Sequence, residues 1–260
     1  MAQPYIISLS SIPPRFDQLG STLESLLAQT VPAQQVVLYL AKEYRRFPDW
    51  DGRLPEVPVG VDVRVVEEDF GPATKVLPAV REFAGQGVEL LFCDDDQIYR
   101  PRLAECLLRE RALRPDDAVC VSGMARYSGL EGQRRNERKP RRRFLWRTTN
   151  PRWQARRFWR RLQSRFGGAD YVQPPARVTL RKGYADGFEG YMGVMLKPEF
   201  FPEEVFDITD FAWAVDDVWL SGHVTRNGHG IWVAGGLMDP MITPVRKPSH
   251  LDDTALNQTA

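Results

Sequence analysis

The sequence is poor in the residue types that build zinc sites and disulfide frameworks. Its 260 residues include only three Cys and three His. Cys93, Cys106 and Cys120 are odd in number, widely spaced and without a Cys-X-X-Cys pair, so we interpret them as reduced core residues of an intracellular protein. His223 and His229 are six positions apart and do not share one helical face, which argues against a zinc site.

Long apolar runs and the common nucleotide-binding fingerprints are also missing. No stretch of 18 uninterrupted apolar residues occurs, which excludes a membrane-spanning helix, and any membrane contact should be peripheral. A strand pattern at Tyr5–Leu9 follows Met1 almost at once, so we expect no signal peptide. The chain has neither a Walker A nor a GxGxxG element. Asp69–Gly71 spells the kinase DFG, but without a Gly-rich or His-Arg-Asp loop it is a chance match.

The formal net charge of +1 conceals a strong separation of charge along the chain. Residues 131–166 contain 14 Lys or Arg and two Glu, a net charge of +12, which leaves −11 for the remainder. Trp146, Trp153, Phe158 and Trp159 are interleaved with these cations. Two electrostatically opposed regions therefore share one chain, and the basic segment should contact a different kind of partner from the rest.

The first half of the chain alternates between strand and helix patterns, which indicates an α/β domain with a mostly parallel, Rossmann-like sheet and helices on both faces. Ligands bind such sheets at the carboxyl ends of the strands. The pattern predicts strands at 5–9, 36–40, 61–66, 90–93, 118–122 and 230–234, and helices at 19–27, 76–83 and 103–113, with a later helix carrying Asp216 and Asp217.

We interpret residues 1–260 as a single domain with four parts. These are an alternating strand–helix half at 1–125, a basic aromatic insert at 131–166, a second half at 178–236 that contains the Asp216–Asp217 pair, and a C-terminal strap at 237–260.

The most informative stretch is an apolar strand pattern at Val88–Cys93 that ends in Asp94, Asp95 and Asp96. Three adjacent carboxylates repel one another, and a buried strand end is a costly place for them without a cation. A hard divalent metal that also holds a phosphate-bearing substrate would stabilise them. The alternative is a polar loop that caps the next helix, because Pro101 could occupy a first helical turn.

A second acidic pair, Asp216 and Asp217, is flanked by apolar residues on both sides. At least one of these carboxylates should therefore face a cleft, where burial raises its pKa toward that of a general base acting near neutral pH. The alternative is a pair at a helix N-terminus, stabilised by the helix dipole and without a catalytic role.

Taken together, the motifs resemble the ordered signatures of bacterial GT-A fold, family-2-like glycosyltransferases. The resemblance covers most of residues 4–235 and rests on Ser8–Arg15, Asp69–Lys75, Phe92–Tyr99, Gly190–Met195 and Val215–Leu220. It implies a metal-dependent transferase that moves a sugar from a nucleotide-diphosphate sugar to a glycan or lipid-linked acceptor, with inversion and with Mn²⁺ or Mg²⁺ as cofactor. It also implies surface-polysaccharide or glycolipid assembly.

The resemblance also implies that residues 1–260 are one catalytic domain, with a nucleotide-binding half at 1–125 and an acceptor-binding and catalytic-base half at 178–236. It implies individual roles as well. Asp217, paired with Asp216, is the expected catalytic base, and the expected metal ligands are Asp94, Asp96 and, in the tail, His250. Donor-binding residues are expected at Ser10, Arg15, Glu68, Asp69, Lys75, Asp94 and Asp95, and acceptor-binding residues at Gly190, Tyr191 and Gly193. Glycine suits the acceptor turn because it lets a ligand approach the backbone closely.

Two other functions stay open at this point. A nucleotidyltransferase would also use an α/β sheet and metal-binding acids, but it would release pyrophosphate instead of a nucleoside diphosphate. A non-enzymatic protein that binds a membrane or a nucleic acid would not need Asp96. For residues 131–166 we favour binding to an anionic membrane surface. The alternatives are a solvated surface segment or a lid over the acceptor, and an arm that binds nucleic acid. We expect a cytoplasmic protein on the inner membrane face.

Overall fold

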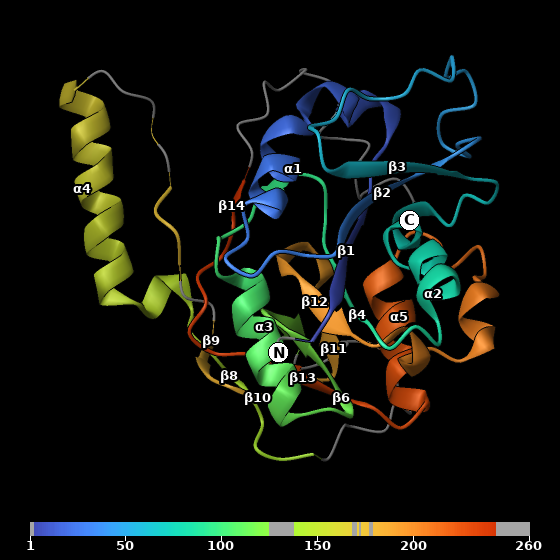
Figure 1. Ribbon diagram of the computed structural model, residues 1–260. Helices are drawn as coiled ribbons and strands as arrows, with labels where there is room; N and C mark the ends of the chain where they lie inside the picture. The colour runs from blue at the N-terminus through green and yellow to red at the C-terminus, as the bar shows by residue number, and fades with distance from the viewer. Residues whose placement is uncertain (1–2, 125–137, 168–170, 172, 177–178, 243–260) are drawn as a thin grey trace.

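A single large mixed sheet organises the chain. The computed structural model describes residues 3–124, 138–167, 171, 173–176 and 179–242. Eight strands follow the order β10-β13-β6-β12-β4-β1-β2-β3, and three two-stranded sheets accompany them (Figure 1). The strands of the large sheet are β1 Tyr5–Ser10, β2 Gln35–Ala41, β3 Val61–Val66, β4 Glu89–Phe92, β6 Asp117–Cys120, β10 Gly183–Tyr184, β12 Val194–Leu196 and β13 Gly230–Val233.

Helices cover both faces of this sheet, as the alternating pattern predicts. One apolar cluster packs α2 and α5 against the sheet, and a second packs α1 and α3 against the opposite face. Strand side chains alternate between the two faces, so neighbouring residues such as Ile6 and Ile7 of β1 belong to different clusters. The helices are α1 Gly20–Leu27, α2 Leu77–Phe83, α3 Leu103–Leu113, α4 Pro151–Gly167 and α5 Asp216–Arg226.

The sheet is less uniformly parallel than the alternation alone suggests. β1 runs parallel to β2 and β4, and β13 runs parallel to β6. However, β12 lies antiparallel between β4 and β6, and β10 is an antiparallel edge beside β13. The turn at Gly190–Met192 immediately precedes β12, so this inserted strand brings the turn to the carboxyl ends of β4 and β6.

The short strands lie around this edge of the sheet. β14 is a further strand beyond the last one predicted, and it pairs antiparallel with β5 directly after the three acids. The start of the C-terminal tail therefore lies beside the acidic turn. The remaining strands are β5 Gln97–Ile98, β7 Gly123–Met124, β8 Arg143–Phe144, β9 Thr179–Arg181, β11 Gly187–Phe188 and β14 Met241–Ile242.

Helix α4, within the predicted basic insert, stands apart from the body beyond α3 and β9 (Figure 1). Residues 131–137 of the insert lie outside the described residues. Cys93 and Cys120 are buried, Cys106 is half-buried, and all three are free thiols, as predicted. No helix within the described part of the chain has the length and apolar character needed to cross a membrane.

Candidate active site

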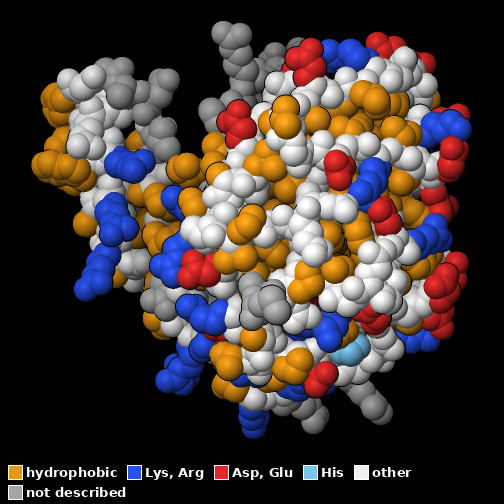
Figure 2. Space-filling view, in the orientation of Figure 1, with side chains coloured by type: hydrophobic (Ala, Val, Ile, Leu, Met, Phe, Trp, Pro, Cys, Tyr) orange, Lys and Arg blue, Asp and Glu red, His pale blue; other side chains and the backbone are white. Residues whose placement is uncertain are grey.

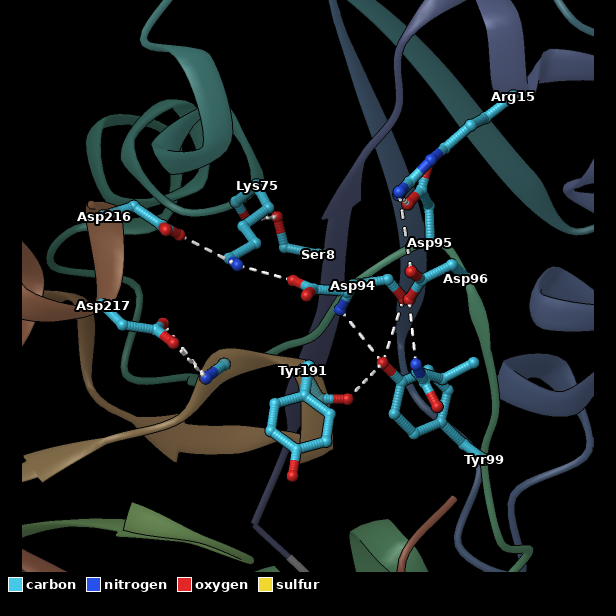
Figure 3. Close-up of polar contacts among 12 residues, drawn as sticks. Ser8, Arg15, Lys75, Asp94, Asp95, Asp96, Tyr99, Tyr191, Asp216 and Asp217 are labelled. Carbon is cyan, nitrogen blue, oxygen red and sulfur yellow. Dashed lines mark hydrogen bonds and ion pairs between the residues drawn. The ribbon is translucent and has the colours of Figure 1, made fainter. Parts of the chain in front are cut away.

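The acidic turn after β4 is anchored through its middle residue. Asp95 is buried, and its carboxylate accepts hydrogen bonds from the Ser11 hydroxyl at 2.5 Å and the Arg15 guanidinium at 2.6 Å. Burial raises the pKa of Asp95, although Arg15 and Ser11 oppose that shift. Asp94 and Asp96 remain about one third exposed, at 31% and 33% of their side chains. Asp95 thus holds the turn in place, while Asp94 points toward Lys75 and both outer acids stay partly exposed (Figure 3).

Lys75 connects the acidic turn to helix α5. Its ammonium lies 2.5 Å from Asp94 Oδ1 and 2.9 Å from Asp216 Oδ2, with only 7% of the side chain exposed (Figure 3). The Lys75 carbonyl accepts a hydrogen bond from Ser8 of β1 at 2.7 Å. Burial works against the charge of Lys75, but Asp216, Asp94 and Asp217 outweigh it and hold its pKa well above the usual value. Lys75 is therefore a buried cation that lies between three carboxylates. Its role at the diphosphate stays a prediction.

Asp217 lies at the start of α5, against the turn that precedes β12. Both of its carboxylate oxygens accept from the Gly190 backbone N–H at 3.0 Å. Burial raises the pKa of Asp217 to about 7; Lys75 opposes this shift and the like charge of Asp216 adds to it. A carboxyl group that titrates near neutral pH suits a general base, as the sequence predicts for one member of this pair.

Position 190 needs glycine because side chains of the site occupy the space that a Cβ would take. A Cβ added there would lie 2.8 Å from Asp217 Oδ1 and 3.0 Å from Lys75 Nζ. Gly193 adopts a φ of +99°, which favours glycine, and its Cβ would meet Leu103 at 3.2 Å. The sequence predicts that a ligand approaches the backbone at these glycines, and the structure adds that they leave room for the site's own side chains and for a backbone of positive φ.

Tyr99 connects the acidic turn to the turn at Gly190–Met192. Its hydroxyl accepts from the Asp94 amide at 3.0 Å and donates to the Tyr191 carbonyl at 2.9 Å. The Tyr191 side chain is 38% exposed beside these contacts (Figure 3). Tyr99 therefore links a predicted donor residue with a predicted acceptor residue, and it is one of the positions that sequence reasoning missed.

The other predicted donor residues lie at the ends of β1 and β3, and Asp69 and Glu68 have contacts within the protein. Asp69 accepts from the backbone N–H groups of Arg45 and Gly71, both at 2.8 Å, and so caps the turn that leads to Lys75. Glu68 is exposed and lies 3.4 Å from Arg81. Ser10 is the half-buried last residue of β1. The structure brings Arg15, Lys75 and Asp94–Asp96 together, while Glu68 is engaged with the α2 side of the sheet.

Two further residues near the site were not predicted from the sequence. Ser11 supplies a hydroxyl to Asp95, and Glu189, directly before Gly190, accepts a hydrogen bond from Ser122. Ser11 falls within the motif Ser8–Arg15, which is the sequence signal that could have identified it. Glu189 is a single acid without a motif around it, and its place near the site is visible only in the three-dimensional structure.

The metal prediction is only partly covered by the described residues. His250 lies outside them. Within the described ranges, no group of three or more His, Cys, Asp or Glu side chains is arranged to hold a metal ion. Asp94 and Asp96 supply two partly exposed carboxylates, which pair with Lys75 at 2.5 Å and with Arg15 at 3.6 Å.

Replacing Gly190 by Ala should lower the free energy of unfolding by about 1.5–3 kcal/mol, the worth of hydrogen bonds to a charged group, because the methyl displaces the Asp217 carboxylate. Chemical denaturation measures this loss. Gly222→Ala in α5 is the matched control, since its Cβ would meet nothing within 4 Å and alanine favours the helix. Equal stability of the two variants would contradict the assigned contact.

Comparisons with known proteins gave structural matches only. No family model and no curated protein matches the sequence. The fold is similar to solved structures of S. aureus TarS, a GT-A-type, family-2-like glycosyltransferase. Residues 1–349 of TarS in complex with UDP match at 12% identity and a TM-score of 0.45, over 91% of this chain and 59% of that one.

Two further TarS structures give similar values. Residues 1–349 alone match at 11% identity and a TM-score of 0.45, covering 92% of this chain and 60% of that one. A longer TarS chain matches at 12% identity and a TM-score of 0.47, covering 92% and 36%. The chain thus spans three fifths or less of the matched proteins, and the likeness is weak.

Proposed function

We propose that this protein is a metal-dependent, inverting glycosyltransferase that uses a nucleotide-diphosphate sugar. The observation that carries the proposal is the Lys75 bridge, which connects Asp94 of the acidic turn to Asp216 beside a second carboxylate, Asp217, of raised pKa. Residues more than 120 positions apart are thus connected by ion pairs through Lys75 into one cluster, with a proposed donor side and a proposed base side.

Asp217 is the proposed base. The acceptor hydroxyl oxygen attacks the anomeric carbon, the proton of that hydroxyl passes to the Asp217 carboxylate, and the bond between the anomeric carbon and the diphosphate oxygen breaks. The nucleoside diphosphate leaves with the electron pair of that bond. With a pKa of about 7, Asp217 is a stronger base than an ordinary aspartate, and a substantial fraction of it is deprotonated at neutral pH and able to accept the proton.

The donor side must neutralise the charge that develops on the leaving diphosphate. Arg15 is 37% exposed while it is paired with Asp95, so its guanidinium can contact a ligand as well as the turn. Lys75 adds a second positive charge near Asp94. These cations suit the ribose–diphosphate portion of a nucleotide sugar, for which the UDP complex of TarS offers a parallel.

The acidic turn fits a divalent cation held jointly with substrate. Mg²⁺ in nucleotide enzymes typically takes one or two carboxylates and completes its shell with phosphate oxygens and water. Asp94 and Asp96, each about one third exposed, would provide those carboxylates. When bound, Mg²⁺ or Mn²⁺ would supply Lewis-acid stabilisation of the departing diphosphate. His250 stays a predicted further ligand.

The acceptor is proposed to be a glycan or a lipid-linked glycan that enters beside Tyr191, whose ring is partly exposed next to the Asp217 turn. A cytoplasmic location stays a prediction from the sequence.

A thermal-shift screen tests the donor assignment. We expect one nucleoside diphosphate to raise the unfolding midpoint in the presence of Mn²⁺ or Mg²⁺, because a ligand that binds only the folded state stabilises it by mass action. Asp96→Asn should remove the metal-dependent part of this shift. Asp62→Asn, on the exposed side of β3, is the control that should retain it. No shift with any nucleotide would contradict the proposal.

Product analysis separates the two enzymatic alternatives. A glycosyltransferase releases a nucleoside diphosphate from the donor, whereas a nucleotidyltransferase releases pyrophosphate. Detection of pyrophosphate with a sugar phosphate and a nucleoside triphosphate would replace the proposed reaction with the second one.

A further inference from the structure

Helix α4 carries an apolar stripe that the described part of the chain leaves largely exposed, with only Leu162 half-buried. Its members recur at helical spacing, at the first position and then three, four, seven and eleven residues later, so they share one face. Three of them are large and exposed: Phe158 at 66%, Trp159 at 61% and Phe166 at 78%. The stripe comprises Ala155, Phe158, Trp159, Leu162 and Phe166.

The opposite side of α4 contacts residues that follow the helix in the same chain. Trp153 is the one buried residue of α4, and its indole N–H donates to the Pro174 carbonyl at 2.9 Å. By helical geometry, Trp153 points away from the stripe. The helix is therefore held by its first turn, with its apolar face directed outward.

Arginines fill the rest of the helix surface. α4 contains six Arg and no Asp or Glu, and between residues 138 and 167 the sequence has 12 Lys or Arg and no acid. Arg152 and Arg165 border the apolar stripe on its two sides. None of the ion pairs within the described ranges includes Arg152, Arg156 or Arg165. Figure 2 shows hydrophobic side chains at the outer edge of the protruding helix, with Arg side chains beside and below them.

We propose that α4 docks this protein on an anionic lipid bilayer, with the Phe158, Trp159 and Phe166 side chains inserted into the headgroup layer. A helix that lies in a membrane interface needs an apolar face and a basic polar face, and its binding strengthens with anionic lipid. The absence of acids along 138–167 matches a negatively charged surface. The aromatic stripe distinguishes a bilayer from a purely ionic partner. This inference is independent of the proposed transferase reaction.

Co-sedimentation of the full chain with vesicles tests the docking. We expect binding to phosphatidylcholine vesicles that contain phosphatidylglycerol, little binding to phosphatidylcholine alone, and weakening at high salt, since surface charge attraction is screened. Phe158→Ala with Trp159→Ala should weaken binding at least about tenfold, because the two rings supply much of the insertable apolar area. Leu113→Ala, an exposed apolar residue at the end of α3, is the control that should bind unchanged.

A charge-reversal pair tests the electrostatic half of the proposal. Arg156→Glu with Arg160→Glu should also weaken binding at least about tenfold, because each basic residue near an anionic surface contributes measurably. Arg109→Glu with Arg226→Glu makes the same change in net charge on helices of the body and should have a much smaller effect. Equal losses in the two pairs would mean that net charge alone drives binding, which would overturn a role specific to α4.

Other occupants of the stripe give different results. Equal recovery in the supernatant with and without anionic lipid would overturn the proposal. So would self-association that Phe158→Ala with Trp159→Ala abolishes, or vesicle binding that a short RNA displaces completely while the aromatic variant keeps its RNA affinity. The nucleotide thermal shift of the aromatic variant should equal that of the unchanged chain, so failure of docking and failure of the transferase proposal are distinguishable.

Discussion

Asp217→Asn is expected to lower the turnover rate by about 10²–10⁴-fold, the usual worth of a positioned general base, while the affinity for the nucleotide is retained. The amide cannot take the acceptor proton, yet its oxygen can still accept from Gly190, where the carboxylate now accepts two contacts at 3.0 Å. The rate is measured as nucleoside diphosphate released with a donor and acceptor on which the unchanged chain is active, and the affinity as the thermal shift.

The pH dependence provides a second readout of the same residue. Only the deprotonated carboxylate is a base, and the pKa of Asp217 is raised to about 7, mainly by burial. The turnover rate should therefore rise with pH through neutrality and then level off. Its rising limb should lie well above the ordinary range of an aspartate, near pH 4.

Asp216→Asn should shift that rising limb to lower pH. The negative charge of Asp216 raises the pKa of Asp217, so its removal makes deprotonation easier. A merely structural role for Asp216 would lower the rate at every pH without moving the limb. Full turnover in Asp217→Asn, or an unchanged limb in Asp216→Asn, would remove Asp217 from the role of base.

Much of the fold follows from hydrophobic periodicity. The predicted strands at 5–9, 36–40 and 61–66 correspond to β1, β2 and β3 within about one residue at each end. The predicted helix 103–113 has the bounds of α3. These elements pack locally and alternate regularly, so their apolar spacing is sufficient to identify them.

The direction and placement of β12 could not be predicted in the same way. Val194–Leu196 is a three-residue apolar strand whose sequence gives no indication of its direction. Its partners are β4 and β6, at least 70 residues earlier in the chain, and it lies antiparallel between them. Only tertiary packing selects that place, because a short apolar strand fits any gap in a buried sheet.

The same distinction applies to the site: the sequence indicates which types of residue lie there, but not which side chains contact one another. The acidic motifs mark segments that the structure brings together, but the three acids lie in a turn after β4, so strand alternation does not set their directions. Asp95 points inward because Ser11 and Arg15 bind its carboxylate. That Lys75 bridges two of these motifs could not be read from spacing, since its partners follow it by 19 and 141 positions. Burial of a lysine is exceptional unless it is paired, and pairing becomes visible only in three dimensions.

The second large effect is expected at Lys75. Lys75→Met should lower the free energy of unfolding by about 3–5 kcal/mol, as expected when one partner of a buried ion pair is removed. The variant would leave Asp94 and Asp216 without their cation, next to a third carboxylate, Asp217. Chemical denaturation measures the loss. It should shrink as the pH is lowered, because protonation removes the unpaired negative charges.

Two control variants separate charge pairing from the mere loss of a lysine. Lys42 also pairs with a carboxylate, Glu67, at 2.9 Å, but its side chain is 57% exposed. Lys42→Met should therefore cost much less stability than Lys75→Met, because exposed ion pairs contribute little. Adding Asp94→Asn and Asp216→Asn to Lys75→Met should restore part of the lost stability, because neutral amides replace the unpaired carboxylates. If Lys75→Met is as stable as Lys42→Met, the bridge between the acidic turn and α5 does not hold the site together. If the triple variant is less stable than Lys75→Met alone, the loss comes from packing and not from charge.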